Sequence, residues 1–403
     1  MITNFLKQRA LLQSLLQKGS FALLEQAFFS GTTFIVNILL IRWLTATGYG
    51  AYTLAFAVLI FASGFYQVWI FEPIALYGPV KYRNSFAYYA RLQSRLFWNL
   101  AIAISLFFGA ITVLLYWFDA VRELQLAFLG IAIGQGGLLS FWLVRRLYYA
   151  RYQVMRLSVL SSINAAIQIG SIIILHLLDI LTPLSAYAVP AVFTMLIAFV
   201  GVLGLGKPIP DKVIATTVRT VIAENWQYGN WLTFSAFLNW LSNYAYFVMV
   251  GAILSIEETG ALRAIQNLTL PAVQFFTVMG MLFFPWASSQ FAEGGHDRLR
   301  KITIIYTAAI TLALNLYYVV LLLLDDVLMQ LLYGGNFGEY RYLVAMLGLI
   351  PIMGGIVTPL SLAIRISHST LYTFLLDLSS TIVVFTISLY LTFSGLQGAV
   401  IGM

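Results

Sequence analysis

The segment Phe128-Leu-Gly-Ile-Ala-Ile-Gly-Gln-Gly-Gly-Leu-Leu-Ser-Phe-Trp-Leu-Val-Arg-Arg-Leu-Tyr-Tyr-Ala-Arg151 decides the fold class of this chain. Its apolar run is long enough to cross a bilayer, and it ends abruptly at Arg145-Arg146. Gly130 and Gly134 form a GxxxG pattern, which allows a neighbouring helix to approach closely. Arginines at the end of a span mark the cytoplasmic side of a membrane. The segment therefore predicts a tightly packed transmembrane helix with a cytoplasmic end.

The composition of the whole chain is that of a membrane protein. Of its 403 residues, 61% are hydrophobic and 9% are charged, and the mean hydropathy is +0.89. A soluble domain carries about 25% charged residues, so a soluble fold could not bury this many apolar side chains. The apolar runs are too long for the strands of a transmembrane β-barrel, which alternate polar and apolar residues over ~10 positions. We therefore predict an all-α, polytopic helical membrane protein.

Charge and cysteine content exclude several other functions. The net charge of +7 is explained by basic cytoplasmic loops, so we expect no nucleic-acid partner. The chain has no cysteine, which excludes disulfides, thiol catalysis and thiolate metal sites. Its three histidines lie far apart in the sequence, and no Ser/His/Asp arrangement is visible. We predict no catalytic residue, no metal and no cofactor.

Eleven complete spans and the beginning of a twelfth are predicted from the apolar runs. Residues 1–18 form an amphipathic helix on the membrane surface, and residues 396–403 resemble the opening of a span that is cut short. The eleven predicted spans cover residues 20–44, 50–74, 95–118, 124–147, 157–178, 183–206, 229–254, 261–287, 302–324, 342–364 and 370–393.

The loop charges test this topology. With a cytoplasmic N-terminus, most of the 22 basic residues fall in inside loops, whereas most acidic residues near span ends fall outside. An incorrect number of spans would destroy this alternation. We therefore predict that the N-terminus is cytoplasmic.

The chain divides into two similar halves, 1–206 and 207–403. The longest polar gap between spans, 207–228, separates them and begins an amphipathic linker. Five positions repeat in order, namely Thr47-Gly48 with Thr259-Gly260, Pro73 with Pro285, Gly136 with Gly355, and Arg146 with Arg365. Six spans per copy is an even number, so the two bundles run parallel across the membrane.

Polar residues within or near the spans are the candidate site. Charged groups in a bilayer are costly and face a bundle interior, a cavity or the interface. The substrate-binding candidates are Arg42, Arg146, Arg263, Arg365, Asn239, Asn243 and Asn267, and the ion-coupling candidates are Glu72 and Asp377.

Each of these candidates also has a structural interpretation. Arginines near span ends, Arg145 included, could extend to the interface, and the asparagines could bond neighbouring helices. Asp377 could pair with Arg365 or Arg156. Glu72 is distinct because it precedes Pro73, which kinks or ends a helix.

Several stretches resemble the polysaccharide flippases of the multidrug/oligosaccharidyl-lipid/polysaccharide exporter superfamily. Residues 31–52 resemble the family's first span and turn, with Gly31-Thr-Thr-Phe-Ile-Val-Asn37, Ile41-Arg42-Trp-Leu44 and Gly48-Tyr-Gly50-Ala-Tyr52. Arg145-Arg146-Leu-Tyr-Tyr-Ala150 is similar to the end of its fourth span, and 229–260 to the start of its second half. The likeness extends over essentially the whole chain. The missing twelfth span departs from the family pattern.

The resemblance implies a fold and a function. It implies two six-helix bundles in a V, which flip polyprenyl-pyrophosphate-linked oligosaccharide across the bacterial inner membrane by alternating access. It implies that Arg42, Arg146, Arg263 and Arg365 face the anionic headgroup, and that Glu72 binds a coupling proton or sodium ion. Membrane lipid, the lipid-linked substrate and the ion are the expected partners of a multi-pass monomer.

Three alternatives remain open. A multidrug exporter of the same superfamily would take organic cations and favour acidic cavity residues. A membrane polysaccharide polymerase or ligase would use a large outer loop, whereas the longest outer loop here is short, at about 325–341. The third alternative is a membrane scaffold without transport activity.

Overall fold

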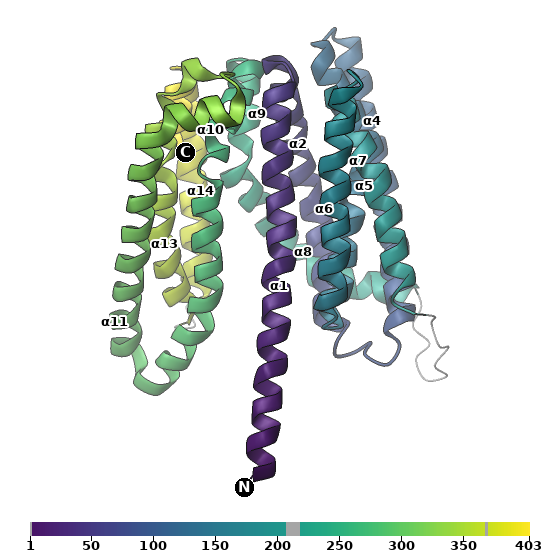
Figure 1. Ribbon diagram of the computed structural model, residues 1–403, viewed down its shortest axis with the longest axis vertical. Coiled ribbons are helices and arrows are strands. Elements are labelled where there is room, and N and C mark those ends of the chain that lie inside the picture. Colours follow the sequence, from purple (N-terminus) through teal and green to yellow (C-terminus); the bar gives the residue numbers. More distant parts are fainter. Residues whose placement is uncertain (1, 207–217, 367–369) are drawn as a thin grey trace. The chain divides into compact units, whose positions relative to one another are not determined.

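The computed structural model describes residues 2–206, 218–366 and 370–403. The side chains of residues 2–19 and of several later positions, Arg365 and Asp377 among them, lie outside the described part. The described backbone is helical almost throughout and contains no strand (Figure 1). This confirms the all-α membrane fold.

Seven segments follow one another in the first part of the chain. They are α1 (Ile2–Trp43), α2 (Ala46–Tyr66), the π-helical turn η1 (Gln67–Phe71), α3 (Glu72–Tyr77), α4 (Phe86–Trp117), α5 (Arg122–Ala150) and α6 (Val154–Leu177). Helices α7 to α11 are α7 (Pro183–Leu203), α8 (Val218–Asn243), α9 (Ala245–Ile253), α10 (Ile256–Asn267) and α11 (Leu270–Tyr333). The remaining segments are the 3-10 turn η2 (Gly338–Tyr340), α12 (Leu343–Leu347), α13 (Leu349–Ile366), α14 (Thr370–Thr392) and α15 (Leu396–Gly402).

Eight helices within the described ranges are long and apolar enough to cross a membrane, or nine if the bent pair α8–α9 counts as one span. The 64-residue α11 contains a break at Gly295, whose φ of 60° and ψ of −154° leave the helical region. Its two limbs coincide broadly with the predicted spans 261–287 and 302–324. In α14 the described stretch Leu378–Thr392 forms a shorter apolar helix. The prediction of eleven complete spans is neither confirmed nor contradicted by these helices.

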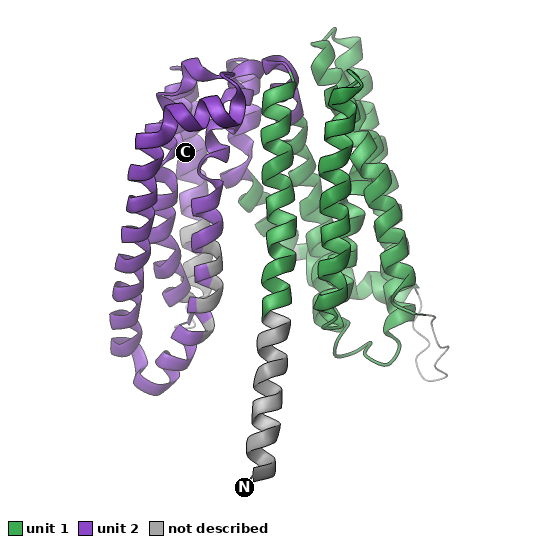
Figure 2. Ribbon diagram, viewed as in Figure 1, with its two compact units in different colours: residues 1–44, 55–240 green, residues 45–54, 241–403 purple. Residues whose placement is uncertain are grey.

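The contacts divide the chain into two compact units (Figure 2). Unit 1 comprises residues 1–44 and 55–240, and unit 2 comprises residues 45–54 and 241–403. Helices α2 and α8 therefore contribute residues to both units. The predicted halves 1–206 and 207–403 describe a duplication in the sequence, and that duplication stays a prediction.

Close backbone packing joins α5 to α7 in unit 1 (Figure 1). A Cβ atom on Gly134 would lie 2.9 Å from the carbonyl oxygen of Tyr187, and one on Gly137 would lie 2.5 Å from that of Ala191. A Cβ atom on Gly130 would approach the backbone of Leu184 to 3.0 Å. The close approach of a neighbouring helix that the GxxxG pattern predicted is therefore confirmed, because glycine has no side chain and the two backbones can touch.

A buried amide connects α5 with two further helices. The Tyr66 hydroxyl of α2 donates to the Gln135 side-chain oxygen at 2.7 Å. The Gln135 amide donates to the Ala101 carbonyl at 2.7 Å and to the Ser105 hydroxyl at 3.1 Å, both in α4. Because Gln135 is fully buried, these bonds satisfy polar atoms that the bilayer could not. They also fix the height of α5 against α2.

Unit 2 has its own glycine contact and aromatic core. The first turns of α2 pack against α10, where a Cβ atom on Gly260 would lie 3.0 Å from the Gly50 nitrogen. The two limbs of α11 meet through stacked Phe283 and Tyr306, whose ring centroids are 3.9 Å apart. Gly355 of α13 packs against Leu314 of α11. These contacts hold the unit together by shape, as expected where lipid provides no hydrophobic driving force.

Replacing Gly137 with alanine should lower the free energy of unfolding by about 1–3 kcal/mol, because the new methyl group would collide with the Ala191 backbone. Thermal unfolding in detergent micelles measures the change. The matched control is Gly170→Ala in α6, where an added Cβ atom meets nothing within 4 Å. Equal melting temperatures for the two variants would contradict the proposed role of the glycine.

Candidate functional site

The second transmembrane helix is continuous from Ala46 to Tyr77 but contains a π-helical turn next to Glu72. Proline has no N–H group, and its ring collides with the carbonyl four residues earlier, so Pro73 cannot continue an undisturbed α-helix. The chain responds with the π-helical turn η1 and starts α3 at Glu72, where a proline in the first turn is tolerated. The Tyr89 hydroxyl donates to the Pro73 carbonyl at 3.1 Å and stabilises the break. Such π turns frequently occur at functional sites.

Glu72 accepts hydrogen bonds from two sides. The Gln67 amide, at the start of η1, donates to Oε1 at 3.3 Å, and the Tyr228 hydroxyl of α8 donates to Oε2 at 3.0 Å. The carboxylate is half-buried. Glu72 therefore connects the broken helix with α8.

Arg146 of α5 lies at the same level as Glu72. The Tyr66–Gln135 bond and the contact between Gly78 and Ala150 show that α2–α3 and α5 run parallel in a fixed register. Arg146 is half-buried. Among the charged groups near its guanidinium, Glu72 has the strongest electrostatic interaction with it. A carboxylate and a guanidinium thus lie within electrostatic range of each other near the end of the bundle that the sequence assigns to the cytoplasm.

Polar contacts hold the first half of α8 along the broken helix. Glu224 forms an ion pair with Lys81 and accepts a hydrogen bond from the Tyr82 hydroxyl at 2.8 Å. Asn225 and Gln93 of α4 exchange two amide hydrogen bonds, of 3.0 and 3.1 Å. Both amides are buried, so the pair satisfies polar atoms on each side.

Two tryptophans continue this contact toward the other end of α8. The Trp69 indole of η1 donates to the Thr233 hydroxyl at 2.9 Å, and the Trp240 indole donates to the Ala57 carbonyl of α2 at 2.7 Å. Later residues of α8 contact earlier residues of the α2–η1 segment, so the two segments are antiparallel. Residues 224–240 therefore lie along the segment from Ala57 to Lys81.

The protonation state of Tyr228 makes it a reliable donor. Burial and the neighbouring Glu72 carboxylate raise the pKa of its phenol. The hydroxyl therefore stays protonated at neutral pH and donates to Glu72 rather than competing with it.

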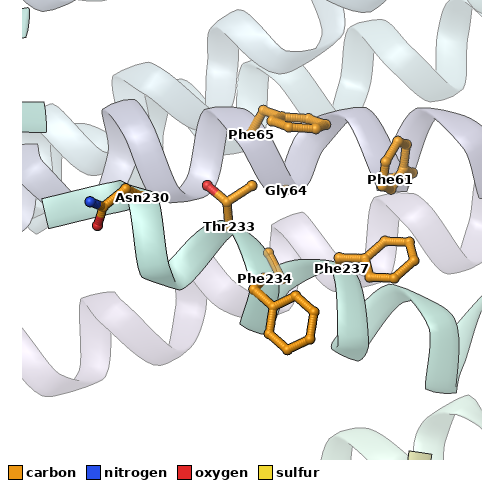
Figure 3. A pocket seen from close by; sticks show the side chains of 8 residues that line it. Phe61, Gly64, Phe65, Asn230, Thr233, Phe234 and Phe237 are labelled. Carbon is orange, nitrogen blue, oxygen red and sulfur yellow. The ribbon is translucent and has the colours of Figure 1, made fainter. Parts of the chain in front are cut away.

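A cavity of about 360 Å³ lies between α2 and α8 within unit 1 (Figure 3). Figure 3 shows the phenylalanine side chains that line it, together with Asn230 and Thr233. The lining residues are Phe61, Gly64, Phe65, Asn230, Thr233, Phe234, Ala236 and Phe237. No charged side chain belongs to this lining, which separates the cavity chemically from the Glu72–Arg146 pair.

Arg145 has a different environment from Arg146. Its guanidinium binds the fully buried Glu25 of α1 through two bonds, of 2.7 and 3.0 Å, and lies 3.7 Å above the Phe29 ring. The same carboxylate accepts bonds from the hydroxyls of Tyr149, at 2.6 Å, and Ser161, at 2.9 Å. This satisfied ion pair connects α1, α5 and α6. It is a structural element, rather than the interfacial arginine that the sequence suggested.

The remaining predicted site residues lie in several environments. Arg42, Asn239 and Asn243 are exposed. Arg263 is buried in α10 and donates to the Gln266 side chain at 3.0 Å, and its guanidinium lies 5.6 Å from the Phe247 ring centre. The side chains of Arg365 and Asp377 fall outside the described part of the structure.

Asn267 lies close to Arg263 in unit 2. Its amide is fully buried and donates to the Tyr49 hydroxyl at 3.1 Å. Arg263 also interacts electrostatically with the Tyr49 phenol. Two of the predicted polar residues are thus brought together within unit 2, and Glu72 and Arg146 within unit 1.

Sequence reasoning missed Gln67 and Tyr228, the two hydrogen-bond donors to Glu72. Tyr228 comes directly before the predicted span 229–254 and shows no pattern of its own. The only local signal was Pro73, which marks a helix break and therefore a need for polar partners. Among the described side chains, no group of three or more His, Asp or Glu residues is placed to hold a metal.

Comparison with known structures identifies the fold. An inward-facing multidrug resistance MATE family transporter of the MOP superfamily superposes with a TM-score of 0.67 at 14% sequence identity, over 94% of this chain and 90% of that chain. MATE in a bent conformation gives a TM-score of 0.57 at 12% identity, over 95% and 93% of the two chains. The eukaryotic MATE transporter AtDTX14 gives 0.56 at 14% identity, over 96% and 90%. At these identities the likeness establishes the fold of a MOP-superfamily transporter.

The family of this chain is identified from its sequence. Residues 15–291 match the family described as polysaccharide biosynthesis protein, which is more than half of the chain. The chain therefore belongs to this family. No individual curated protein matches it in sequence. Family and fold together define a multi-pass membrane protein of the polysaccharide biosynthesis family with the fold seen in MATE transporters.

Substituting Glu25 with leucine should lower the free energy of unfolding by about 3–5 kcal/mol, because Arg145 would keep a desolvated, unpaired charge. The double variant Glu25→Leu/Arg145→Leu should recover much of this loss in the same thermal-unfolding assay. Arg298→Leu is the control, since its exposed pair with Glu293 should contribute less than about 1 kcal/mol. A double variant no more stable than Glu25→Leu would refute a buried pair.

Proposed function

We propose that this chain flips lipid-linked oligosaccharide precursors of polysaccharides across the bacterial plasma membrane by alternating access, driven by an ion gradient. Membership of the polysaccharide biosynthesis family and the transporter fold support the general class. The Glu72–Arg146 pair supports the particular substrate and the coupling, because it combines a cation for a pyrophosphate with a carboxylate for an ion.

The chemistry of this pair provides a coupling mechanism. An ionised Glu72 neutralises Arg146 and holds Tyr228 by a 3.0 Å hydrogen bond. A proton or sodium ion on Glu72 removes that negative charge and leaves the guanidinium for the pyrophosphate of the substrate. The two anions thus compete for one cation, so binding of the ion favours binding of the lipid headgroup.

The other candidate residues lie apart from this pair. Arg263 and Asn267 of unit 2 form a second polar group, in which a buried guanidinium lies beside an amide and phenols. Arg42, Arg365, Asn239 and Asn243 are further candidates for contacts with the headgroup or the sugars. Asp377 is a second candidate for ion coupling.

A multidrug cation exporter is the second candidate function. One specific observation favours it besides the MATE fold. The cavity between α2 and α8 is lined by four phenylalanines, and aromatic faces attract organic cations. Its lining contains no carboxylate, which weakens this alternative.

Reconstituted full-length protein should move a fluorescent polyprenyl-pyrophosphate oligosaccharide between the leaflets of liposomes when an ion gradient is applied. Accessibility of the fluorophore to an impermeant quencher measures the movement. Glu72→Gln should abolish the response to the gradient, because a neutral amide cannot exchange a proton or hold a cation. Efflux of tetraphenylphosphonium without movement of the lipid would decide for the multidrug alternative.

Arg146→Ala and Arg365→Ala should each reduce lipid movement at least tenfold, while membrane insertion and the amount of protein stay unchanged. The reason is the loss of a cation facing the pyrophosphate. Arg298→Ala removes an exposed cation elsewhere and serves as the control. Wild-type movement by the Arg146 variant would remove this residue from the site.

A further inference from the structure

We propose that the aromatic cavity between α2 and α8 binds a segment of the apolar polyprenyl chain of the substrate, next to the site of its anionic headgroup. The inference rests on the proposed function and adds the location of the lipid chain. The cavity lies within unit 1, and Figure 3 shows the phenylalanine rings that surround it.

Most of the described lining residues are apolar, and Asn230 and Thr233 are its polar members. Phe61, Phe65, Phe234 and Phe237 supply aromatic faces, and no ionisable side chain takes part. The Thr233 hydroxyl is already engaged, because it accepts from the Trp69 indole at 2.9 Å and donates to the Gly229 carbonyl at 2.9 Å. A sugar or phosphate placed there would lose its hydration without adequate replacement. A hydrocarbon chain meets no such penalty.

The size of the cavity fits part of a chain. Its volume is about 360 Å³, whereas an apolar cavity of about 150 Å³ holds a benzene molecule. By this comparison it accommodates a stretch of roughly a dozen carbon atoms, or two to three isoprene units. The Phe234 ring is 50% exposed and the Phe237 ring 39% exposed, so the cavity is open on the α8 side and the rest of a long chain can leave it.

The position of the cavity matches an amphiphile with an anionic head. Phe65 and Phe61 precede Glu72 by two and three helical turns along the same interrupted helix, which corresponds to about 10–17 Å at 1.5 Å per residue. Arg146 stands at the level of Glu72. A pyrophosphate at Arg146 would therefore place the first isoprene units of its chain beside these phenylalanines. The cation and the apolar cavity are complementary to the two ends of one molecule.

Filling the cavity tests this arrangement. A Cβ atom on Gly64 would lie 3.5 Å from the Ala236 Cβ atom, which is ordinary contact, so the backbone accepts a side chain there. Gly64→Leu should project its branched end into the cavity, and Ala236→Leu should fill it from the opposite helix. Gly64→Ala should have a smaller effect than Gly64→Leu. The matched control is Gly109→Leu in α4, where an added Cβ atom meets nothing within 4 Å.

Equilibrium binding of tritiated geranylgeranyl pyrophosphate to the full-length protein in nanodiscs gives the readout. Gly64→Leu and Ala236→Leu should each weaken binding at least tenfold, and Gly109→Leu less than twofold. Inorganic pyrophosphate should bind to both cavity variants within twofold of wild type and lose affinity in Arg146→Ala. If both leucine variants keep wild-type affinity for geranylgeranyl pyrophosphate, the proposal is wrong.

Two further outcomes separate the cavity from the proposed transport function. Movement of lipid-linked oligosaccharide by wild type that is equally fast in Gly64→Leu and Ala236→Leu would overturn the chain site and leave the flippase proposal intact. No movement by wild type, together with chain binding that depends on Gly64 and Ala236, would overturn the flippase proposal alone. Cavity-dependent binding of tetraphenylphosphonium but not geranylgeraniol would assign the cavity to organic cations and overturn the lipid proposal.

Discussion

A charged group inside a bilayer has to be matched by groups of the protein, and this constraint arranges unit 1. Helix α5 carries two consecutive arginines, which an α-helix directs about 100° apart. Arg145 turns toward Glu25 and is fully matched by a carboxylate, two hydroxyl-bearing residues that share it and an aromatic face. Arg146 turns toward Glu72 and keeps part of its surface exposed. One arginine thus holds three helices together, while its neighbour remains available for a ligand.

The fold of this protein and the chemistry of its candidate site bear on different properties. A fold shared with MATE proteins at 14% identity shows how the helices are arranged but does not determine a substrate. The substrate depends on the local chemistry. In unit 1 this chemistry separates into a polar pair at Glu72 and Arg146 and an apolar cavity nearer the middle of α2. A ligand that uses both must carry a negative charge at one end and a hydrocarbon chain at the other.

Local features of the sequence predicted the fold well, whereas contacts between distant residues were out of reach. Apolar length predicted the helices, and Gly130 and Gly134 predicted the close approach of α7, because both signals are local. Pro73 drew attention to Glu72 for the same reason. The partners of these residues were not predictable: Tyr228 and Glu25 meet theirs across more than a hundred residues, and side-chain geometry decides between several polar candidates. The break at Gly295 falls in the loop predicted between spans 261–287 and 302–324, although helix continues on both sides of it.

The π turn before Glu72 has a further consequence for how this helix changes in related sequences. A π turn is equivalent to one extra residue inserted into an α-helix, so it shifts the phase of everything that follows by about 100°. The faces of α2 that carry Phe61 and Phe65 are therefore set independently of the direction in which Glu72 points. Loss of a single residue between Gln67 and Phe71 would remove the π turn and rotate the carboxylate away from Tyr228, while the span would stay long and apolar enough to cross a membrane. Insertions and deletions at this turn would thus alter the ionic site without disturbing the membrane fold.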